Sequence, residues 1–318
     1  MAITTINTLP APVQQWFDKV LLSRPMPNLM YKRFGLKKTL PSREGRTIRF
    51  RRYNNLAPAI VPLGPSGVSP AAQSLTAVDI DATIEWYGSY VLITDQVTAV
   101  NQDPVLNETA SLLAQSMRES EDILTRDMLV ATASQVNCVN GGDGDNPTEL
   151  TRIDIDIVVQ TLLSNNAMFI SDDIEGSLKF GTAPIREAFW MFMNSSIIDD
   201  LENVTGFISQ AQYPSYQNIL PYEWGSVGNV RVLQSSFGAQ TPQTSMLGNT
   251  VYHNMIVARE AYGCVDLTEA TAEFIYKPLG YGDDPLNQRQ TAGYKFAYAT
   301  RILNDTWTVD LASTSSGA

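Results

Sequence analysis

The chain has 318 residues, of which 44% are hydrophobic and 17% are charged, and its formal net charge is −11. This composition is typical of a folded globular protein with a sizeable core, and it excludes a disordered or low-complexity chain. The two cysteines, Cys138 and Cys264, stand far apart without neighbouring ligand residues, which argues against a disulfide scaffold and a zinc site.

The charge is distributed unevenly. Residues 1–52 contain 11 of the 22 Lys and Arg residues but two of the 33 acidic residues, so they carry about +9 and the remainder about −20. Segments of opposite sign attract one another, within one molecule or between neighbours. The sequence has no run of about 18 apolar residues, and residues 1–17 lack the features of a signal peptide. We therefore expect a soluble protein, made in a cytoplasm, with no membrane partner.

Residues 1–45 predict an extended arm. Five prolines interrupt this segment, and a single short helical candidate begins at a proline, at residues 12–23. Its large apolar residues are few and scattered, so the arm needs another surface to lie on. A disordered tail in the isolated monomer is the alternative.

Two alternating segments then predict a β-hairpin. Ile48 and Phe50 alternate with polar residues in the basic segment 45–55, and residues 77–86 place apolar side chains on one face and mostly acidic ones on the other. A loop rich in proline and glycine joins them, and cross-strand pairs of opposite charge are expected between them. Because an isolated hairpin is marginal in water, its apolar face must be covered by the rest of the chain or by another copy.

Residues 103–135 predict a long helix. Asp103 is a suitable N-cap, Pro104 occupies the first helical position, and apolar residues recur every three or four positions except where Glu121 interrupts them. The expected apolar face consists of Leu106, Ala110, Leu113, Met117, Leu124, Met128 and Ala131. A helix this long usually serves as a spine. A coiled-coil dimer is the alternative, which the alanines on this face disfavour.

The rest of the middle predicts a mixed α and β body. Residues 140–147 contain closely spaced acidic residues, but Pro147 occupies a ligand position of a calcium loop, so a solvated turn is expected. The remaining predicted elements are a helix at 151–167 capped by Thr151, a buried strand and a short helix within 187–204, and strands at 229–236 and 251–260.

No catalytic, cofactor-binding or metal-ligating residues are predicted. His253 is the only histidine, and its apolar strand surroundings indicate a packed or interface side chain. Phosphate-binding glycine motifs are absent from the sequence. Acidic pairs stand beside turns and helix ends, where carboxylates commonly act as caps, at Asp172/Asp173, Asp199/Asp200 and Asp283/Asp284. A carboxylate-dependent hydrolase nevertheless stays open as an alternative.

The segment 280–305 begins with a turn and continues as a strand. Gly280, Gly282 and Pro285 favour the turn. After it, the large residues Tyr294, Phe296 and Tyr298 alternate with Lys295, Ala297, Ala299 and Arg301.

Three segments carry a resemblance to a known family. They are "GDDPLNQRQTAGYKFAYATRILND" near the C-terminus, "EGRTIRFRRYNNL" at the start of the hairpin, and "EWYGSYVLITDQV" at residues 85–97. With the order of the predicted elements, they resemble the major capsid protein of tailed bacteriophages, which has the Hong Kong 97-type fold. The resemblance covers nearly the whole chain, although residues 184–270 match by the order of their elements alone.

The resemblance implies an α+β fold in five parts. These are an N-terminal arm (1–45), an extended β-hairpin loop (46–100), a peripheral domain with the spine helix (101–183), an axial domain (184–270) and a return to the peripheral domain (271–318). In such a fold the last strand rejoins the peripheral sheet, so Phe296 and Trp307 are expected to lock the spine helix. Arg289, Lys295 and Arg301 are expected to face acidic partners on the same or an adjacent subunit, with solvated cations as the alternative.

The function implied is structural and non-enzymatic. The chain is expected to assemble as homo-hexamers and homo-pentamers into an icosahedral virion shell that encloses double-stranded DNA without sequence-specific binding. Scaffolding, portal and decoration proteins are the expected further partners, no cofactor is expected, and synthesis and assembly would take place in the host bacterial cytoplasm. An encapsulin-like compartment shell with protein cargo is the second alternative.

Overall fold

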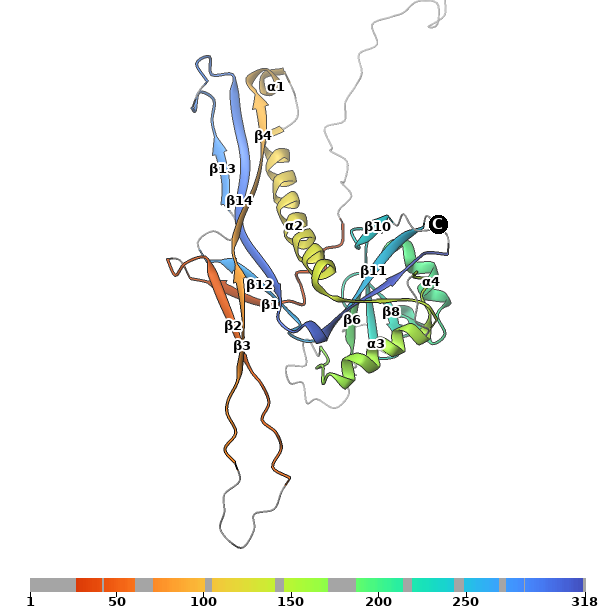
Figure 1. The fold of residues 1–318 in the computed structure, drawn as a ribbon. Helices are drawn as coiled ribbons and strands as arrows, with labels where there is room; N and C mark the ends of the chain where they lie inside the picture. The colour runs from red at the N-terminus through yellow and green to blue at the C-terminus, as the bar shows by residue number, and fades with distance from the viewer. Residues whose placement is uncertain are drawn as a thin grey trace, which may run out of the picture.

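The computed structural model describes residues 27–41, 43–60, 71–100, 105–140, 146–170, 187–213, 219–242, 249–268, 273–282 and 284–316. Within these residues the chain forms two packed bodies, each built on a large sheet, and a separate two-stranded hairpin (Figure 1). The predicted α+β class is therefore confirmed. The helical candidate at 12–23 lies outside the described residues.

The first body is built on a long sheet of five strands. They are β1 (Leu36–Leu40), β4 (Glu85–Thr94), β12 (Tyr262–Leu267), β13 (Glu273–Lys277) and β14 (Arg289–Ile302). Strand β14 is central: β4 pairs antiparallel with it along one edge, and β13 and β12 pair antiparallel with it in succession along the other. Strand β1 extends the sheet by pairing parallel with β12.

Helix α2 (Val105–Thr132) runs along this long sheet (Figure 1). Its Leu113 and Leu129 are buried in one apolar cluster with Phe296 of β14. A short helix, α1 (Asp95–Val100), follows β4 at the far end of the sheet. The predicted spine helix is thus present and lies against the closing strand, and its caps at Asp103 and Pro104 fall outside the described residues.

The second body is built on an eight-stranded sheet in the order β5-β15-β11-β6-β9-β8-β7, with β10 paired to β11. Its helices are α3 (Arg152–Ser164) and α4 (Ile198–Asn203). The predicted cap residue Thr151 precedes α3 directly. The strands are β5 (Ser134–Asn137), β6 (Phe189–Asn194), β7 (Phe207–Ser209), β8 (Glu223–Val227), β9 (Val230–Ser235), β10 (Gln240–Pro242), β11 (Thr250–Val257) and β15 (Thr308–Ser313).

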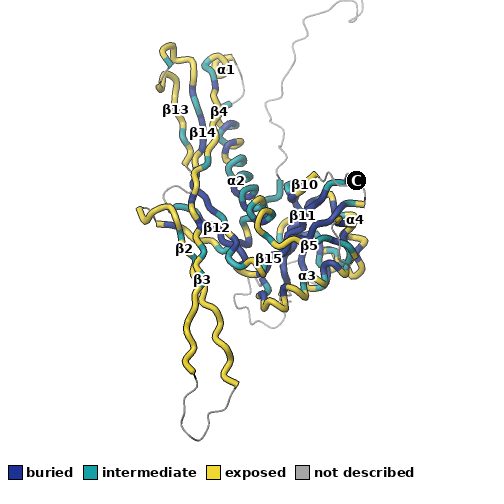
Figure 2. Tube along the Cα trace, viewed as in Figure 1, coloured by how far each residue is buried: buried dark blue, intermediate teal, exposed yellow. Residues whose placement is uncertain are grey.

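The hairpin consists of β2 (Thr47–Tyr53) and β3 (Ala77–Thr83), paired antiparallel. It projects away from both bodies (Figure 1), and its outer part is exposed along its described length (Figure 2). The base is anchored, because Ile48 and Phe50 pack against a small cluster that includes Ile84 and Val265. The predicted hairpin is therefore confirmed, with support from the same subunit at its base alone.

Residues 27–40, which we name the strap, lie within the predicted arm and pack against their own subunit. Met30, Tyr31 and Phe34 are buried in the same cluster as the spine helix and the central strands of both sheets, and Leu40 is buried beside the hairpin base. The scattered apolar side chains of this part of the arm insert between the two bodies of their own subunit.

Two further details differ from the sequence-based expectations. The predicted strand 77–86 is broken at Ile84, where β3 ends and β4 begins, so that β4 belongs to the long sheet and not to the hairpin. The spine helix buries a more polar face than predicted, since Thr109, Glu121, Asp122 and Thr125 are buried while Leu106 and Ala131 are exposed. Glu121 belongs to the packed face because its carboxylate pairs with a partly buried lysine, which is described below.

The expected five-part division stays a prediction, and the two sheets cross its boundaries. Strand β5 and helix α3 belong to the second body, although both lie within the segment 101–183. Strand β12 joins the long sheet, and β15 near the C-terminus returns to the eight-stranded sheet.

Candidate assembly surfaces

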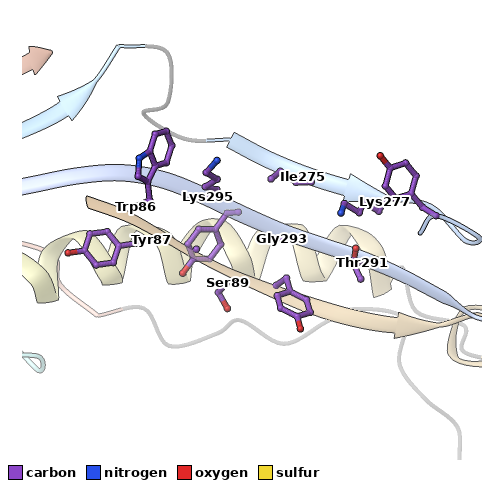
Figure 3. A pocket seen from close by; sticks show the side chains of 12 residues that line it. Trp86, Tyr87, Ser89, Ile275, Lys277, Thr291, Gly293 and Lys295 are labelled. Carbon is purple, nitrogen blue, oxygen red and sulfur yellow. The ribbon is translucent and has the colours of Figure 1, made fainter. Parts of the chain in front are cut away.

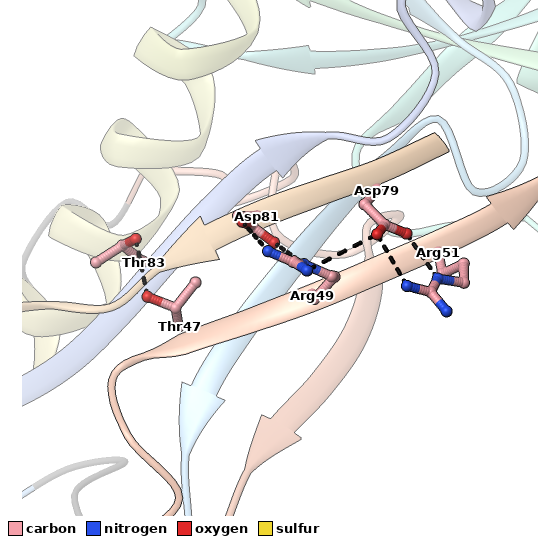
Figure 4. Close-up of polar contacts among 6 residues, drawn as sticks. All are labelled: Thr47, Arg49, Arg51, Asp79, Asp81 and Thr83. Carbon is pink, nitrogen blue, oxygen red and sulfur yellow. Dashed lines mark hydrogen bonds and ion pairs between the residues drawn. The ribbon is translucent and has the colours of Figure 1, made fainter. Parts of the chain in front are cut away.

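The hairpin carries a ladder of paired charges (Figure 4). Arg49 donates to both carboxylate oxygens of Asp81 at 2.7 and 2.9 Å, and Arg51 donates to those of Asp79 at the same two distances. Hydrogen bonds from these arginines hold the pKa values of Asp79 and Asp81 below their ordinary value. In such bidentate pairs, both carboxylate oxygens accept a hydrogen bond from the guanidinium. The charges of the ladder therefore favour this strand register and are already neutralised within the hairpin.

The hairpin tip, residues 54–76, is uncharged, and its described residues are exposed. Residues 54–76 contain no charged side chain and include four prolines, Pro58, Pro62, Pro65 and Pro70. Of the described tip residues, Leu56 is 54% exposed and Ile60 is 84% exposed. A protruding loop with exposed aliphatic side chains and no charge is typical of a segment that packs on another molecule.

A second apolar surface lies on the long sheet, on the side away from helix α2 (Figure 3). It forms a hollow of about 630 Å³ lined by aromatic and lysine side chains. Tyr90 is 71% exposed there, and Trp86 and Tyr281 are also exposed. We name this surface the aromatic face; it is lined by Trp86, Tyr90, Ile275, Lys277, Tyr281 and Lys295.

The lysines of the aromatic face lie against its rings. Lys295 Nζ is 4.4 Å from the ring centroid of Trp86, and Lys277 Nζ is 5.2 Å from that of Tyr281. Such contacts attract a cation to the face of the ring. The predicted acidic partners of Arg289, Lys295 and Arg301 are not found within the described part of this subunit, where no ion pair involves these three side chains. Partners on an adjacent subunit stay a prediction.

Two glycines allow the strands beneath the aromatic face to approach closely. A Cβ atom at Gly88 would lie 2.8 Å from the backbone oxygen of Tyr294, and one at Gly293 would lie 2.8 Å from Cβ of Tyr90. Both distances are too short for real atoms. A larger residue at either position would therefore push β4 and β14 apart and deform the surface.

The strap is held to the spine helix by buried charge. Lys32 Nζ lies 2.8 Å from a carboxylate oxygen of Glu121 and 3.2 Å from one of Asp266, while Asp122 accepts hydrogen bonds from the backbone N–H groups of Met30 and Lys32. Burial raises the pKa of both Glu121 and Asp122 above the ordinary value. This network joins the strap, α2 and β12, and it explains the acidic residues on the packed face of α2.

The closing strand locks the spine helix, as predicted for Phe296, but hydroxyl groups contribute as well. Tyr298 and Thr125 share a hydrogen bond of 2.8 Å, and Tyr294 lies 3.1 Å from the hydroxyl of Ser116. Trp307 packs at the margin of both large clusters and donates a hydrogen bond to the backbone oxygen of Asn165 after α3. It therefore links the two bodies rather than contacting the helix alone.

The residues considered for chemistry mostly have structural partners. Asp200 accepts hydrogen bonds from Ser316, and Asp284 accepts one from the backbone N–H of Arg289. Asp172 and Asp173 lie outside the described residues. Among the residues that the structure describes, no group of three or more potential ligands gathers as a metal site, and no helix is long and apolar enough to span a membrane. His253 is buried between Asp310 and Thr241.

The comparisons with known proteins agree with this architecture. The sequence pattern of a family described as phage capsid protein matches residues 77–302. The chain belongs to this phage capsid protein family. No match was found among the curated proteins. The match confirms the resemblance. It covers the spine helix and most of both bodies, while residues 44–56 and strand β15 lie outside the matched range.

Solved capsid structures share the fold of this capsid protein at low sequence identity. The capsid of Ralstonia phage GP4 is 11% identical, with a TM-score of 0.70 over 96% of each chain. The capsid of cyanophage P-SCSP1u is 13% identical, with a TM-score of 0.65 over 96% of this chain and 94% of that one. The head structure of Helicobacter pylori bacteriophage KHP40 is 8% identical, with a TM-score of 0.65 over 98% of this chain and 99% of that one. The predicted Hong Kong 97-type capsid fold is thus confirmed.

Proposed function

We propose that this capsid protein assembles as hexamers and pentamers into an icosahedral shell around double-stranded DNA, in the cytoplasm of a host bacterium. The observation that carries the proposal is the position of its two exposed apolar surfaces. The hairpin tip and the aromatic face lie toward opposite ends of one elongated subunit (Figure 1), so one subunit cannot bring its own tip onto its own face. Copies of the chain provide the missing cover.

The contact between tip and face is of the head-to-tail kind. One patch of a subunit meets a different patch of the next, which closes into a ring when the rotation between copies permits it. Proline-rich segments fit grooves lined by aromatic rings, because they are already extended and lose little conformational entropy on binding. A standard protein interface buries about 1,600 Å² in total. The tip and the face together supply the apolar centre of such an interface.

The charge distribution suits a container for DNA. The chain beyond residue 52 carries about −20, and an acidic body avoids tight, non-specific attachment to phosphate. The ladder on the hairpin is neutralised internally, so the net positive charge available to a neighbour comes from the other basic residues of the N-terminal part. We assign to residues 1–26 the role of an arm that contacts a neighbouring subunit. We treat the long sheet with α2 as the peripheral domain and the second body as the axial domain.

The catalytic alternative gains no support from the described hollows. No carboxylate lines the aromatic face, and Asp127 is the one carboxylate among the residues that line a second hollow beside β10. A carboxylate-dependent hydrolase needs two or more carboxylates in one cleft. We therefore assign a structural, non-enzymatic role, in which scaffolding, portal and decoration proteins are further partners.

Electron microscopy and sedimentation of the expressed chain test the proposal. Closed shells of uniform size are expected, and particles made during phage infection should contain DNA protected from nuclease. A single small oligomer at all concentrations would contradict a shell function. Shells that enclose protein and exclude DNA during infection would favour the encapsulin-like alternative.

A further inference from the structure

Three side chains from adjacent strands of the second body form a chain of hydrogen bonds. His253 of β11 places Nδ1 2.6 Å from Oδ2 of Asp310 on β15, and its Nε2 lies 2.9 Å from Oγ1 of Thr241 on β10. The order is carboxylate, imidazole, hydroxyl. This is the arrangement in which a base activates a hydroxyl nucleophile while a third group orients the base.

The burial and hydrogen-bond partners of Asp310, His253 and Thr241 indicate which group donates and which accepts each proton. Asp310 is 1% exposed, and its other oxygen, Oδ1, has no hydrogen-bond partner among the described residues. A carboxylate facing Nδ1 favours the proton on that nitrogen, which leaves the lone pair of Nε2 directed at Thr241. The hydroxyl of Thr241 then donates its hydrogen bond to His253. The imidazole is poised to accept the hydroxyl proton.

The hydroxyl end of this chain is accessible. Thr241 is exposed, and it lines with His253 a hollow of about 480 Å³ between the spine helix and β10. Arg126 lines the same hollow and donates three hydrogen bonds, two to Asp127 and one to the backbone oxygen of Phe237. The guanidinium of Arg126 therefore places a positive charge beside the hollow, where it attracts a developing negative charge.

We propose that Thr241 is an acyl-acceptor site, activated by His253 and oriented through Asp310. The substrate class is an activated carboxylic ester small enough to enter the hollow. Oγ1 of Thr241 attacks the acyl carbon and forms a C–O bond, and Nε2 of His253 takes the hydroxyl proton. The carbon–oxygen bond to the leaving group then breaks, and the proton passes from Nε2 to the departing alkoxide. The products are acylated Thr241 and a free alcohol, with no oxidant or other reactant required.

The test uses p-nitrophenyl acetate on the purified full-length chain, with mass spectrometry to locate acetyl groups. Thr83 of the hairpin is the control, because its exposed hydroxyl lies 3.2 Å from that of Thr47 and has no imidazole partner. General-base assistance is typically worth about 10²- to 10⁴-fold. Acetylation of Thr241 should therefore outpace that of Thr83 by at least about 100-fold.

Variants separate activation from simple exposure. Thr241→Ser should retain fast acetylation, Thr241→Val should lose it, and His253→Gln should reduce the rate at Thr241 to that at Thr83. The comparison of the two threonines within the wild-type chain does not depend on the folding of any variant. Equal rates at Thr241 and Thr83 in the wild type, or an unchanged rate in folded His253→Gln, would overturn the proposal.

Discussion

Replacement of Phe34 by alanine tests whether the strap belongs to the folding core of the subunit. The Phe34 side chain is 7% exposed, and its ring stacks on Trp190 with 4.9 Å between centroids and lies 5.5 Å from Phe192. Removing a buried phenylalanine typically costs about 3–5 kcal/mol. Because whole domains are stable by about 5–15 kcal/mol, Phe34→Ala should remove a large fraction of the free energy of unfolding.

The assay is urea unfolding of unassembled subunits, followed by far-ultraviolet circular dichroism. Leu56→Ala on the exposed hairpin tip is the matched control, because a surface substitution is expected to change stability by no more than about 0.5 kcal/mol. Leu56→Ala should instead reduce the yield of particles. If Phe34→Ala unfolds at the same urea concentration as the wild type, the strap is not part of the folding core.

Three further predictions follow from the strap and the ladder. Deletion of residues 1–26 should leave a folded subunit with impaired assembly, whereas deletion of 1–45 should also lower the urea midpoint because it removes the strap. Reversing both arginine charges of the ladder should lower the yield of particles, and swapping all four charges should restore it; failure of the swap would mean that the ladder contacts a neighbour. Burial raises the pKa values of Glu121 and Asp122 above their ordinary 4.5 and 3.8. The folded state therefore binds protons more tightly than the unfolded state. The free energy of unfolding should fall as the pH rises from the ordinary pKa values through the raised ones. Glu121→Gln should flatten that fall in pH-dependent urea unfolding, while Glu119→Gln should leave it unchanged.

The elements that the sequence predicted well have strong local periodicity. The spine helix, the hairpin and the closing strand each show a regular alternation or a three-to-four-residue repeat, so local patterns suffice to identify them. The opposite charges of the hairpin strands also predicted the cross-strand pairs that the ladder shows, while the register itself comes from the structure. Residues 85–97 were identified by resemblance, and their membership in the long sheet follows from pairing with a strand some 200 residues later.

The strap and the aromatic face could not be found from local patterns. In the sequence, Lys32 is one of several basic residues of the predicted arm. Its partners Glu121 and Asp266 are distant in sequence, so local patterns cannot identify the ion pairs. Glu121 likewise reads as a break in an apolar face, because its pairing with Lys32 is a tertiary contact. The aromatic face requires three strands to be placed side by side. The sequence signal nearest to it is the presence of two strand glycines, Gly88 and Gly293, which pair with Lys295 and Tyr90 and are not part of a turn.

The central claim is that copies of this chain cover one another's hairpin tip and aromatic face. Hydroxyl-radical footprinting of free subunits and of assembled particles measures this directly, because it reports the solvent accessibility of individual side chains. Oxidation of Leu56 and Ile60 on the tip, and of Trp86 and Tyr90 on the face, should fall together on assembly. Particles in which these four side chains are oxidised as fast as in the free subunit would contradict the account.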